Sequence, residues 1–349
     1  MLTSKRIVKA SLLLVFAVVL AAGWWWMSLN QYLDEPLPLK ESYSYELKPG
    51  SNYIRVLNEL NQAGLLGETH YLRWYGRLTG KARHIKAGEY EIPAGMTARQ
   101  LVDMLISGKV RQYALTLVEG WNFRQVMDAV HSHPSLEHTL QGMSDEALME
   151  RLGHAGEHPE GRFLPDTYHF PKNLSDVAFL QRAYNAMASL LAQEWEARAV
   201  GLPLDTAYEA LILASIVEKE TGLASERQAI AGVFVRRLEK RMRLQTDPTV
   251  IYGMGERYKG NIRKSDLLED TPYNTYRRFG LPPTPIAMPG RDAIHATLHP
   301  DDSKNIYFVA RGDGSHHFSA TLEEHNNAVI KYQLKGRKQP FSSYNPSTN

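Results

Sequence analysis

The chain contains no cysteine among its 349 residues, and neither sign of charge dominates. The absence of cysteine excludes disulfides, a thiolate nucleophile and cysteine-ligated metal, and it suits an oxidising compartment. Because 40 Lys and Arg residues nearly balance 38 Asp and Glu residues, no strong field indicates a nucleic acid or an acidic partner. GxSxG, Walker A and dinucleotide-binding motifs are also missing. Acid/base chemistry without a cofactor is therefore the main enzymatic option.

One long apolar run stands at the amino terminus. Residues 10–27 carry no charge, and three basic residues precede them. A helix that crosses a bilayer takes roughly 17–25 such residues. The basic residues predict that 1–9 are cytoplasmic, and the tryptophans at 24–26 are typical of the outer interface. We therefore predict a single-pass anchor with the rest of the chain outside. A cleaved signal peptide is the alternative, because small residues stand at 21–23.

Next to the anchor we predict a tether and a small α+β domain. Residues 28–49 are polar and contain prolines, which is typical of a tether. Residues 52–80 show helical spacing that Gly64 and Gly67 divide into two helices, and the sequence GEYEIP then alternates as a strand. The small domain is expected over 50–110.

Residues 111–340 are expected to form a larger mixed α+β domain, followed by a tail at 341–349. Capping-box patterns that begin at Thr97, Asn122 and Ser225 predict the starts of three helices. Other expected elements are strands at 112–118 and 305–310, helices at 206–221, at 225–241 and from about 321, and a loop-rich stretch from 245 to 300.

The helix that carries Glu218 is the most unusual part of the chain. Residues 210–217 are apolar or small on every side, which predicts a helix surrounded by protein. Glu218 ends this run, where a dry core and the negative end of the helix dipole both raise the pKa of a carboxyl. A raised pKa suits a general acid. The alternative is an ordinary solvated helix end, and Glu220, on another side of the helix, is the better candidate for the solvated carboxylate.

Two other groups of residues bear on function. The segments 244–253, 272–290 and 316–319 concentrate Tyr, Asn, Thr, Gln and Asp, which suits a sugar-binding cleft or, equally, rigid packed loops. His295 and His299 stand four residues apart, but no Glu follows the first as HExxH requires, so no metal site is predicted.

Four segments together carry a family resemblance: SIVEKETG, LQTDPTVIYG, PYNTYRRFGLPPTPIAMPG and GSHHFSATLEEHN. In this order behind one apolar run, they closely resemble the endolytic murein transglycosylase family, also called the MltG or YceG-like family. The resemblance spans essentially the whole chain, with a LysM-like unit over 50–110 and the segment EGRFLPDTYHFP. Thr284 stands where a glycine is expected, which puts only the local loop shape in doubt.

The resemblance implies a function and a site. Glu218 matches the catalytic glutamate of a family that cleaves the β-1,4 bond between N-acetylmuramic acid and N-acetylglucosamine in nascent peptidoglycan. The products carry 1,6-anhydro ends, and the reaction ends strand elongation near peptidoglycan synthases at the bacterial inner membrane, with the catalytic domain in the periplasm. Candidate substrate-binding residues are Ser215, Gln245, Thr246, Asp247, Tyr273, Asn274, Tyr276, His317 and Ser319. The alternative is a non-catalytic, membrane-anchored scaffold that binds peptidoglycan.

Overall fold

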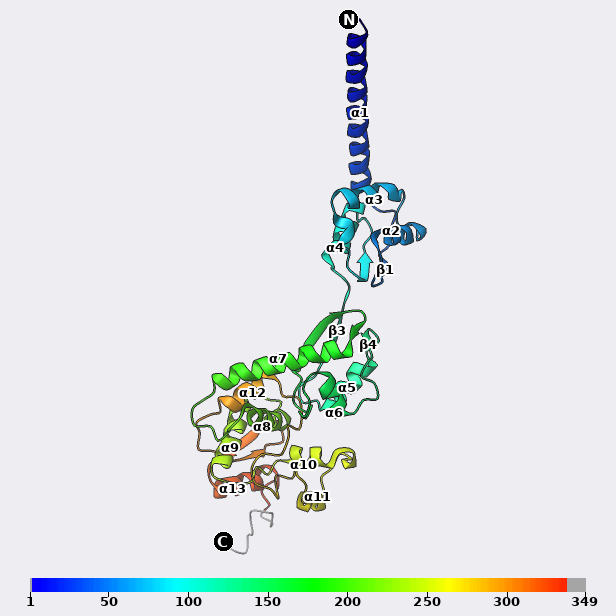
Figure 1. The fold of residues 1–349 in the computed structure, drawn as a ribbon. Helices are drawn as coiled ribbons and strands as arrows, with labels where there is room; N and C mark the ends of the chain where they lie inside the picture. Colours follow the sequence, from blue (N-terminus) through cyan, green and yellow to red (C-terminus); the bar gives the residue numbers. More distant parts are fainter. Residues whose placement is uncertain (1, 338–349) are drawn as a thin grey trace. The chain divides into compact units, whose positions relative to one another are not determined.

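The structure, a computed structural model, describes residues 2–337, so residue 1, the end of the predicted catalytic domain and the predicted tail lie outside the described residues. The chain divides into two compact units (Figure 1). The small unit comprises Met1–Tyr113 and Phe170–Lys172. The large unit comprises Ala114–His169 and Asn173–Asn349.

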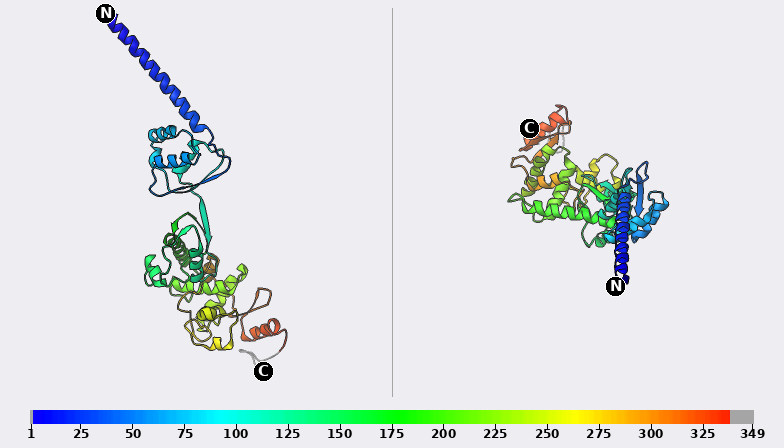
Figure 2. Two further views of the ribbon diagram at one scale, coloured as in Figure 1. Left: turned by 90° about the vertical axis from the view of Figure 1, so that its right-hand side faces the viewer. Right: turned by 90° about the horizontal axis from the view of Figure 1, so that it is seen from above.

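The small unit begins with α1 (Leu2–Asp34), an unbroken helix that Figure 2 shows leaving the rest of the unit as a single rod. Its segment Arg6–Asp34 is long and apolar enough to cross a membrane, with a mean hydropathy of 2.2 over its most apolar window. The large apolar side chains from Ile7 to Leu20 are exposed. This agrees with the apolar run read from the sequence.

The rest of the small unit follows the order β1 (Tyr43–Leu47), α2 (Tyr53–Gln62), α3 (Thr69–Leu78), β2 (Gly88–Ile92) and α4 (Ala98–Ser107), with a short 3-10 helix, η1 (Lys81–Arg83), after α3. The strands β1 and β2 pair antiparallel. Asn52 caps α2, and the predicted capping box of Thr97 and Gln100 starts α4. The two helices expected between 52 and 80 and the strand after them are present.

Residues 28–49 differ from the tether that their composition predicts. Leu29 and Leu33, the last apolar residues of α1, are each 1 % exposed in the core of the small unit. Leu37, Tyr45 and Leu47 join the same core. Apolar residues at wide spacing in this polar stretch were enough to bury one side of it, so α1 runs directly into the folded unit.

The large unit is built around α8 (Ala207–Glu220), which contacts α7 (Asp176–Glu196), α9 (Arg227–Glu239), α10 (Asp247–Met254) and α12 (Arg291–Leu298). Neighbours on several sides explain why the middle of α8 is apolar all round. The other helices are α5 (Phe123–Ser132), α6 (Asp145–Arg151), α11 (Lys264–Leu268) and α13 (Leu322–Tyr332), with 3-10 helices η2 (Ala224–Glu226) and η3 (Gly255–Arg257).

Strands form only small pairs in the part of the chain that the structure describes. β3 (Gln112–Thr116) pairs with β5 (Thr167–Pro171), and β4 (Leu136–Glu137) pairs in parallel with β6 (Leu174–Ser175). β7 (Tyr307–Ala310) and β8 (His316–Ser319) form an antiparallel hairpin. The α+β class is thus confirmed in its coarse form, with helices in the majority.

Two sequence predictions for the large unit need correction. The capping box expected at Ser225 is absent, because residues 224–226 form the 3-10 turn η2 and α9 begins at Arg227 without a side-chain cap. The stretch from 245 to 300 also contains more helix than expected, since α10, α11 and α12 lie within it. Pro248 at the start of α10 occupies a position where proline favours a helix instead of breaking it.

Candidate active site

Glu218 lies in the last turn of α8, directly after the buried residues 210–217. Thr206 caps the start of this helix, and its end at Glu220 is followed by Thr221 in an extended conformation. The helix therefore delivers Glu218 from the interior of the large unit to its surface. The carboxyl is only partly exposed.

The surroundings of Glu218 favour its protonated form. Burial is the largest cause that raises the pKa of Glu218 above its ordinary value, and the charge of Glu119 adds to it. The backbone N–H of Gly290 donates to Oε2 at 2.9 Å, which lowers the pKa, as do the charges of Arg227 and Lys219. The raised pKa agrees in direction with the prediction from the sequence.

Glu119 and Gly290 complete this environment, and the sequence did not single out either of them. A Cβ added to Gly290 would overlap the Glu119 carboxylate, so that carboxylate lies directly against the glycine that binds Glu218. Arg227 approaches Glu119 at 3.9 Å and pairs with Asp292 at 3.1 Å. The Glu218 carboxylate thus accepts a hydrogen bond from Gly290, the Glu119 carboxylate lies against the same glycine, and Arg227 lies beside Glu119.

A pocket of about 780 Å³ opens between α5, α10 and the end of α8. Gly120 and Lys219 line it, and the Lys219 ammonium donates to the Gly120 carbonyl at 3.1 Å. Gly120 has a left-handed φ of 76°, and a Cβ built there would lie 3.9 Å from Cγ of Glu218. Glu218 therefore adjoins two residues of the pocket wall.

Glu160, unlike the partly exposed Glu218, is buried, and it lines the same pocket. The Phe123 N–H donates to both of its oxygens at 3.0 and 3.2 Å, and the Tyr252 hydroxyl donates to Oε2 at 3.0 Å. Burial raises the pKa of Glu160 to about 7 despite these bonds. This glutamate stands in the quoted segment EGRFLPDTYHFP, but no local pattern marked it as buried.

Glu220 differs from the solvated carboxylate that its place on the helix predicts. Burial is the main cause that raises the pKa of Glu220 to about 7, and the charge of Asp247 adds to it. Asp247 is the first residue of α10, which packs against α8 and brings this carboxylate to the side of Glu220. Helix geometry alone could not show that another segment packs there.

Four of the predicted substrate-binding residues lie in the interior. Ser215 is fully buried; its hydroxyl donates to the Ile212 carbonyl at 2.7 Å and accepts from the Ile286 N–H at 3.0 Å. Thr246, Asn274 and Ser319 are at most 2 % exposed. Because a sugar cannot reach a side chain in the core, the structure corrects the expectation of direct contact for these four.

Asn274 instead holds the loop around it together. Its amide nitrogen donates to three carbonyls, including that of Glu269 at 2.6 Å, and its oxygen accepts from the Tyr276 N–H at 2.9 Å. A short polar side chain that satisfies several backbone groups is typical of a structural loop residue. The alternative of rigid, packed loops therefore holds for this position.

The other five candidates are at least partly accessible. Gln245 and Asp247 are exposed, and Tyr273, Tyr276 and His317 are partly exposed. The Tyr276 hydroxyl donates to Oδ1 of Asp247 at 2.6 Å, so the structure brings these two together. His317 lies on β8, where its ring is 5.5 Å from that of Tyr332.

Thr284 fits its loop without backbone strain. It is not among the described residues with a positive φ, so the position does not require glycine. Its hydroxyl donates to the Pro285 carbonyl at 2.9 Å and lies 2.8 Å from the Tyr273 hydroxyl. The ring of Tyr273 in turn packs 4.9 Å from that of Tyr252, the partner of Glu160.

Among residues 2–337, one group of three side chains has the spacing of a metal site. It consists of Glu194 on α7, His295 on α12 and His299 at the end of α12, with ligand atoms within 4.8 Å of one another. His295 Nδ1 lies 2.9 Å from the Glu194 carboxylate, so a hydrogen bond already accounts for that contact. The site at Glu218 lies at the other end of α12, which begins after its N-cap Gly290.

Comparison with known proteins decides the family. A model of the YceG-like family matches residues 45–331. The chain belongs to the YceG-like family. An endolytic murein transglycosylase of Bacillus subtilis is 30 % identical over 315 residues, which cover 84 % of this chain and 85 % of the relative. The resemblance stated from the sequence is thereby confirmed.

Two further relatives are similar to most of this chain. An endolytic murein transglycosylase of Streptococcus pneumoniae is 27 % identical over 86 % of this chain, which spans 61 % of that longer relative. The crystal structure of a YceG-like protein from Listeria monocytogenes superposes with a TM-score of 0.52 at 30 % identity. The match covers 83 % of this chain and 99 % of that one. The chain therefore shares its fold with a solved YceG-like protein.

Proposed function

We propose that the chain is an endolytic lytic transglycosylase that cleaves the β-1,4 bond between N-acetylmuramic acid and N-acetylglucosamine in nascent peptidoglycan. Relatives that cover most of the chain are named endolytic murein transglycosylases. The observation that carries the proposal is Glu218, a carboxyl with a raised pKa at the end of a buried helix and next to the wall of a pocket. Such a group is suited to proton donation near neutral pH.

Glu218 acts first as an acid and then as a base. It protonates the glycosidic oxygen while the bond to C1 of N-acetylmuramic acid breaks, and the sugar passes through an oxocarbenium-like state. The Glu218 carboxylate then takes the proton of the C6 hydroxyl, whose oxygen closes onto C1 to form the 1,6-anhydro ring. The proton count balances without water. The Gly290 N–H stabilises the carboxylate between the two steps.

The pocket beside Glu218 is the proposed place for the sugars. Gln125, Asp128 and Tyr252 are accessible in its wall and offer an amide, a carboxylate and an aromatic ring, which is the combination of polar and apolar groups that a glycan site uses. Gln245, Asp247, Tyr273, Tyr276 and His317 stay candidates for substrate contact because they are accessible. No metal or cofactor takes part in the proposed step.

The small unit is proposed to bind glycan as a LysM-like module, and α1 to anchor the chain in the inner membrane with the large unit in the periplasm. The order β1, α2, α3, β2 with a paired β1 and β2 supports the first point. The length and apolar surface of α1 support the second. We further propose that cleavage near peptidoglycan synthases ends strand elongation.

The mass of the products tests this function. Purified glycan strands treated with the full chain are expected to yield fragments with anhydro ends. Fragments one water heavier, with reducing ends, would contradict the proposal and indicate a hydrolase. The competing function, a non-catalytic scaffold, predicts that the protein sediments with peptidoglycan but releases no soluble fragments.

A further inference from the structure

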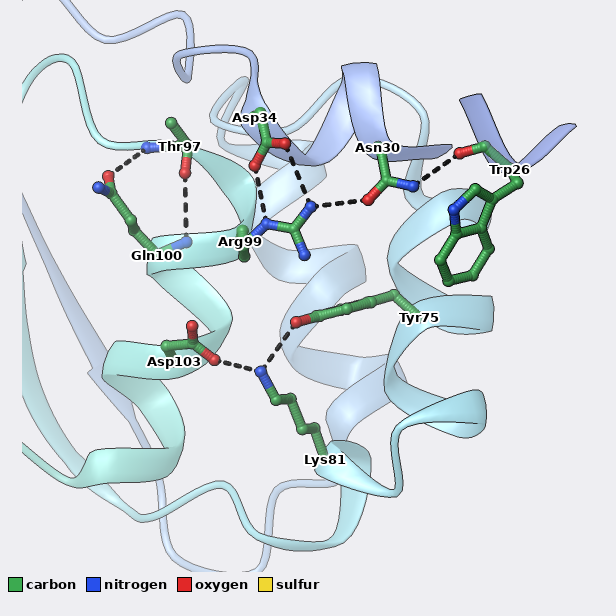
Figure 3. A network of polar contacts seen from close by, with 9 residues as sticks. All are labelled: Trp26, Asn30, Asp34, Tyr75, Lys81, Thr97, Arg99, Gln100 and Asp103. Atoms are coloured by element: carbon green, nitrogen blue, oxygen red, sulfur yellow. Dashed lines mark hydrogen bonds and ion pairs between the residues drawn. The ribbon is translucent and has the colours of Figure 1, made fainter. Parts of the chain in front are cut away.

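The end of α1 is built into the small unit by polar as well as apolar contacts (Figure 3). Arg99 on α4 donates to Asp34 at 2.7 Å and to the Asn30 side-chain oxygen at 2.9 Å. The Asn30 amide donates to the Trp26 carbonyl at 2.9 Å. With Leu29 and Leu33 buried on the adjacent face of the helix, the contacts of Arg99 fix the last turns of α1 against the small unit.

Helix α3 lies against α1 at the level of the tryptophan belt. The rings of Trp25 and Trp74 meet edge to face at 6.2 Å, and those of Tyr32 and Tyr71 lie 5.2 Å apart. Tryptophans at the end of a membrane-spanning helix sit at the depth of the lipid headgroups. Because Trp74 touches one member of that belt, it lies at the same depth once α1 spans a bilayer.

The outer face of α3 has the composition of an interfacial helix. Trp74 and Leu78 are 49 % and 60 % exposed, and with Tyr71 they form a stripe at positions i, i+3 and i+7. Arg73 and Arg77 are exposed beside this stripe. An apolar stripe flanked by arginines is typical of a helix that lies in the plane of a membrane surface.

We propose that α3 lies in the outer interface of the bilayer that α1 crosses, with Trp74 and Leu78 among the headgroups and Arg73 and Arg77 on lipid phosphates. The occupant of this face is a phospholipid surface, because the face continues the belt of α1 and carries positive charge. The inference rests on the proposed membrane anchor. Two elements then hold the small unit on the membrane, so it does not hang from a single helix.

Site-directed spin labelling tests this proposal, because the chain has no cysteine and a single introduced one carries the only label. The full chain is reconstituted in vesicles of phosphatidylethanolamine and phosphatidylglycerol. Leu78→Cys reports on α3, Leu14→Cys on the centre of α1, and Glu91→Cys on β2. Collision rates with oxygen and with a water-soluble nickel chelate give the depth of each label.

The label at Leu78→Cys is expected roughly 5–10 Å into the interface, protected from the nickel chelate, while that at Glu91→Cys stays in water. Equal access of the chelate to both would overturn the proposal, provided that the Leu14→Cys label lies deep in the lipid. A Leu14→Cys label in water would refute the anchor itself. The mass of the glycan products is measured separately and does not depend on either outcome.

A double variant tests the role of charge. Arg73→Gln with Arg77→Gln is expected to make the Leu78→Cys label shallower in vesicles with phosphatidylglycerol, at the depth found in neutral phosphatidylcholine vesicles. The same label without these changes is expected to lie deeper in the anionic vesicles. If the double variant leaves the depth unchanged, the contact of the arginines with phosphate is refuted.

Discussion

Both units contain carboxylates that an arginine keeps charged, as Arg278 does for Asp270 in the large unit, but among the described residues the carboxyls with a raised pKa all lie in the large unit. In the small unit, hydrogen bonds from Arg99 lower the pKa of Asp34, and those from Arg55 and Tyr45 lower the pKa of Glu59. In the large unit, burial is the largest cause that raises the pKa of Glu218, Glu160 and Glu220. The small unit thus keeps carboxylates charged to link its elements, whereas the large unit makes three carboxyls harder to ionise.

This difference separates a structural use of carboxyl groups from a chemical one. A charged carboxylate beside an arginine stabilises a position, but it cannot donate a proton near pH 7. A buried carboxyl without such a partner costs stability, and this cost is commonly met at functional sites. The raised pKa values therefore make Glu160 and Glu220, as well as the predicted Glu218, candidates for a chemical role in the large unit.

The largest expected effect is on activity. Glu218→Gln removes the proton that the proposed step requires, and we expect the release of soluble glycan fragments to fall roughly 10²–10⁴-fold. The fold should persist, because the substitution replaces a carboxyl whose burial opposes its charge. Glu239→Gln, at an exposed position on α9, is the matched control. Full activity of Glu218→Gln would remove Glu218 from the mechanism.

The second prediction concerns stability and pH at Glu160. Its folded-state pKa is about 7 and its ordinary value 4.5, so between these pH values the folded protein keeps a proton that the unfolded chain loses. Stability therefore falls as pH rises across this window, by roughly 3 kcal/mol for this group. In Glu160→Gln the decline in melting temperature from pH 5 to pH 8 should be shallower. It should not vanish, because Glu220 contributes with the same sign. An unchanged slope would show that Glu160 is not desolvated in solution.

The third prediction tests the shared glycine. Gly290→Ala would place a methyl group on the Glu119 carboxylate, and moving this flexible, half-exposed side chain away should cost up to about 1 kcal/mol of stability and lower activity. Gly222→Ala is the control, since nothing lies within 4 Å of a Cβ built there. Adding Glu119→Ala to Gly290→Ala should restore stability. A double variant as unstable as Gly290→Ala would argue against the overlap with Glu119 as the cause.

The smallest effect is expected in the small unit. Arg99→Gln removes the partner of Asp34 that lowers the pKa of this carboxyl in the folded protein. The pair therefore stabilises the fold at pH values above the pKa of Asp34 in the unfolded chain, and this stability is lost as pH falls through its pKa in the folded protein. Because the pair is exposed, the melting temperature at pH 7 should drop only slightly. Arg55→Gln, which breaks the exposed pair with Glu59, is the matched comparison. A drop as large as that of Gly290→Ala would break the contrast between the two units.

Elements with a strong local pattern could be predicted from the sequence. The capping boxes at Thr97 and Asn122 and the helices around Gly64 and Gly67 are present because each depends on residues within one or two turns. The long helix α7 and the burial of residues 28–49 were missed. For α7 the pattern is in the sequence, since its buried residues stand at helical spacing after the cap Ser175. In residues 28–49 the few apolar residues are spaced among polar ones, and only the packing of the unit shows which side is covered.

The candidate site, too, could be predicted only in part from the sequence. The apolar and small residues at 210–217 were enough to predict that Glu218 ends a buried helix, and the family resemblance assigned Glu218 a role. Only the tertiary structure decided that the Gly290 N–H binds it from 72 residues away, that Glu119 lies beside that glycine, and that Glu160 is buried at the same pocket. Helical periodicity is set by near neighbours in the chain, whereas a contact between distant segments depends on how all of them pack.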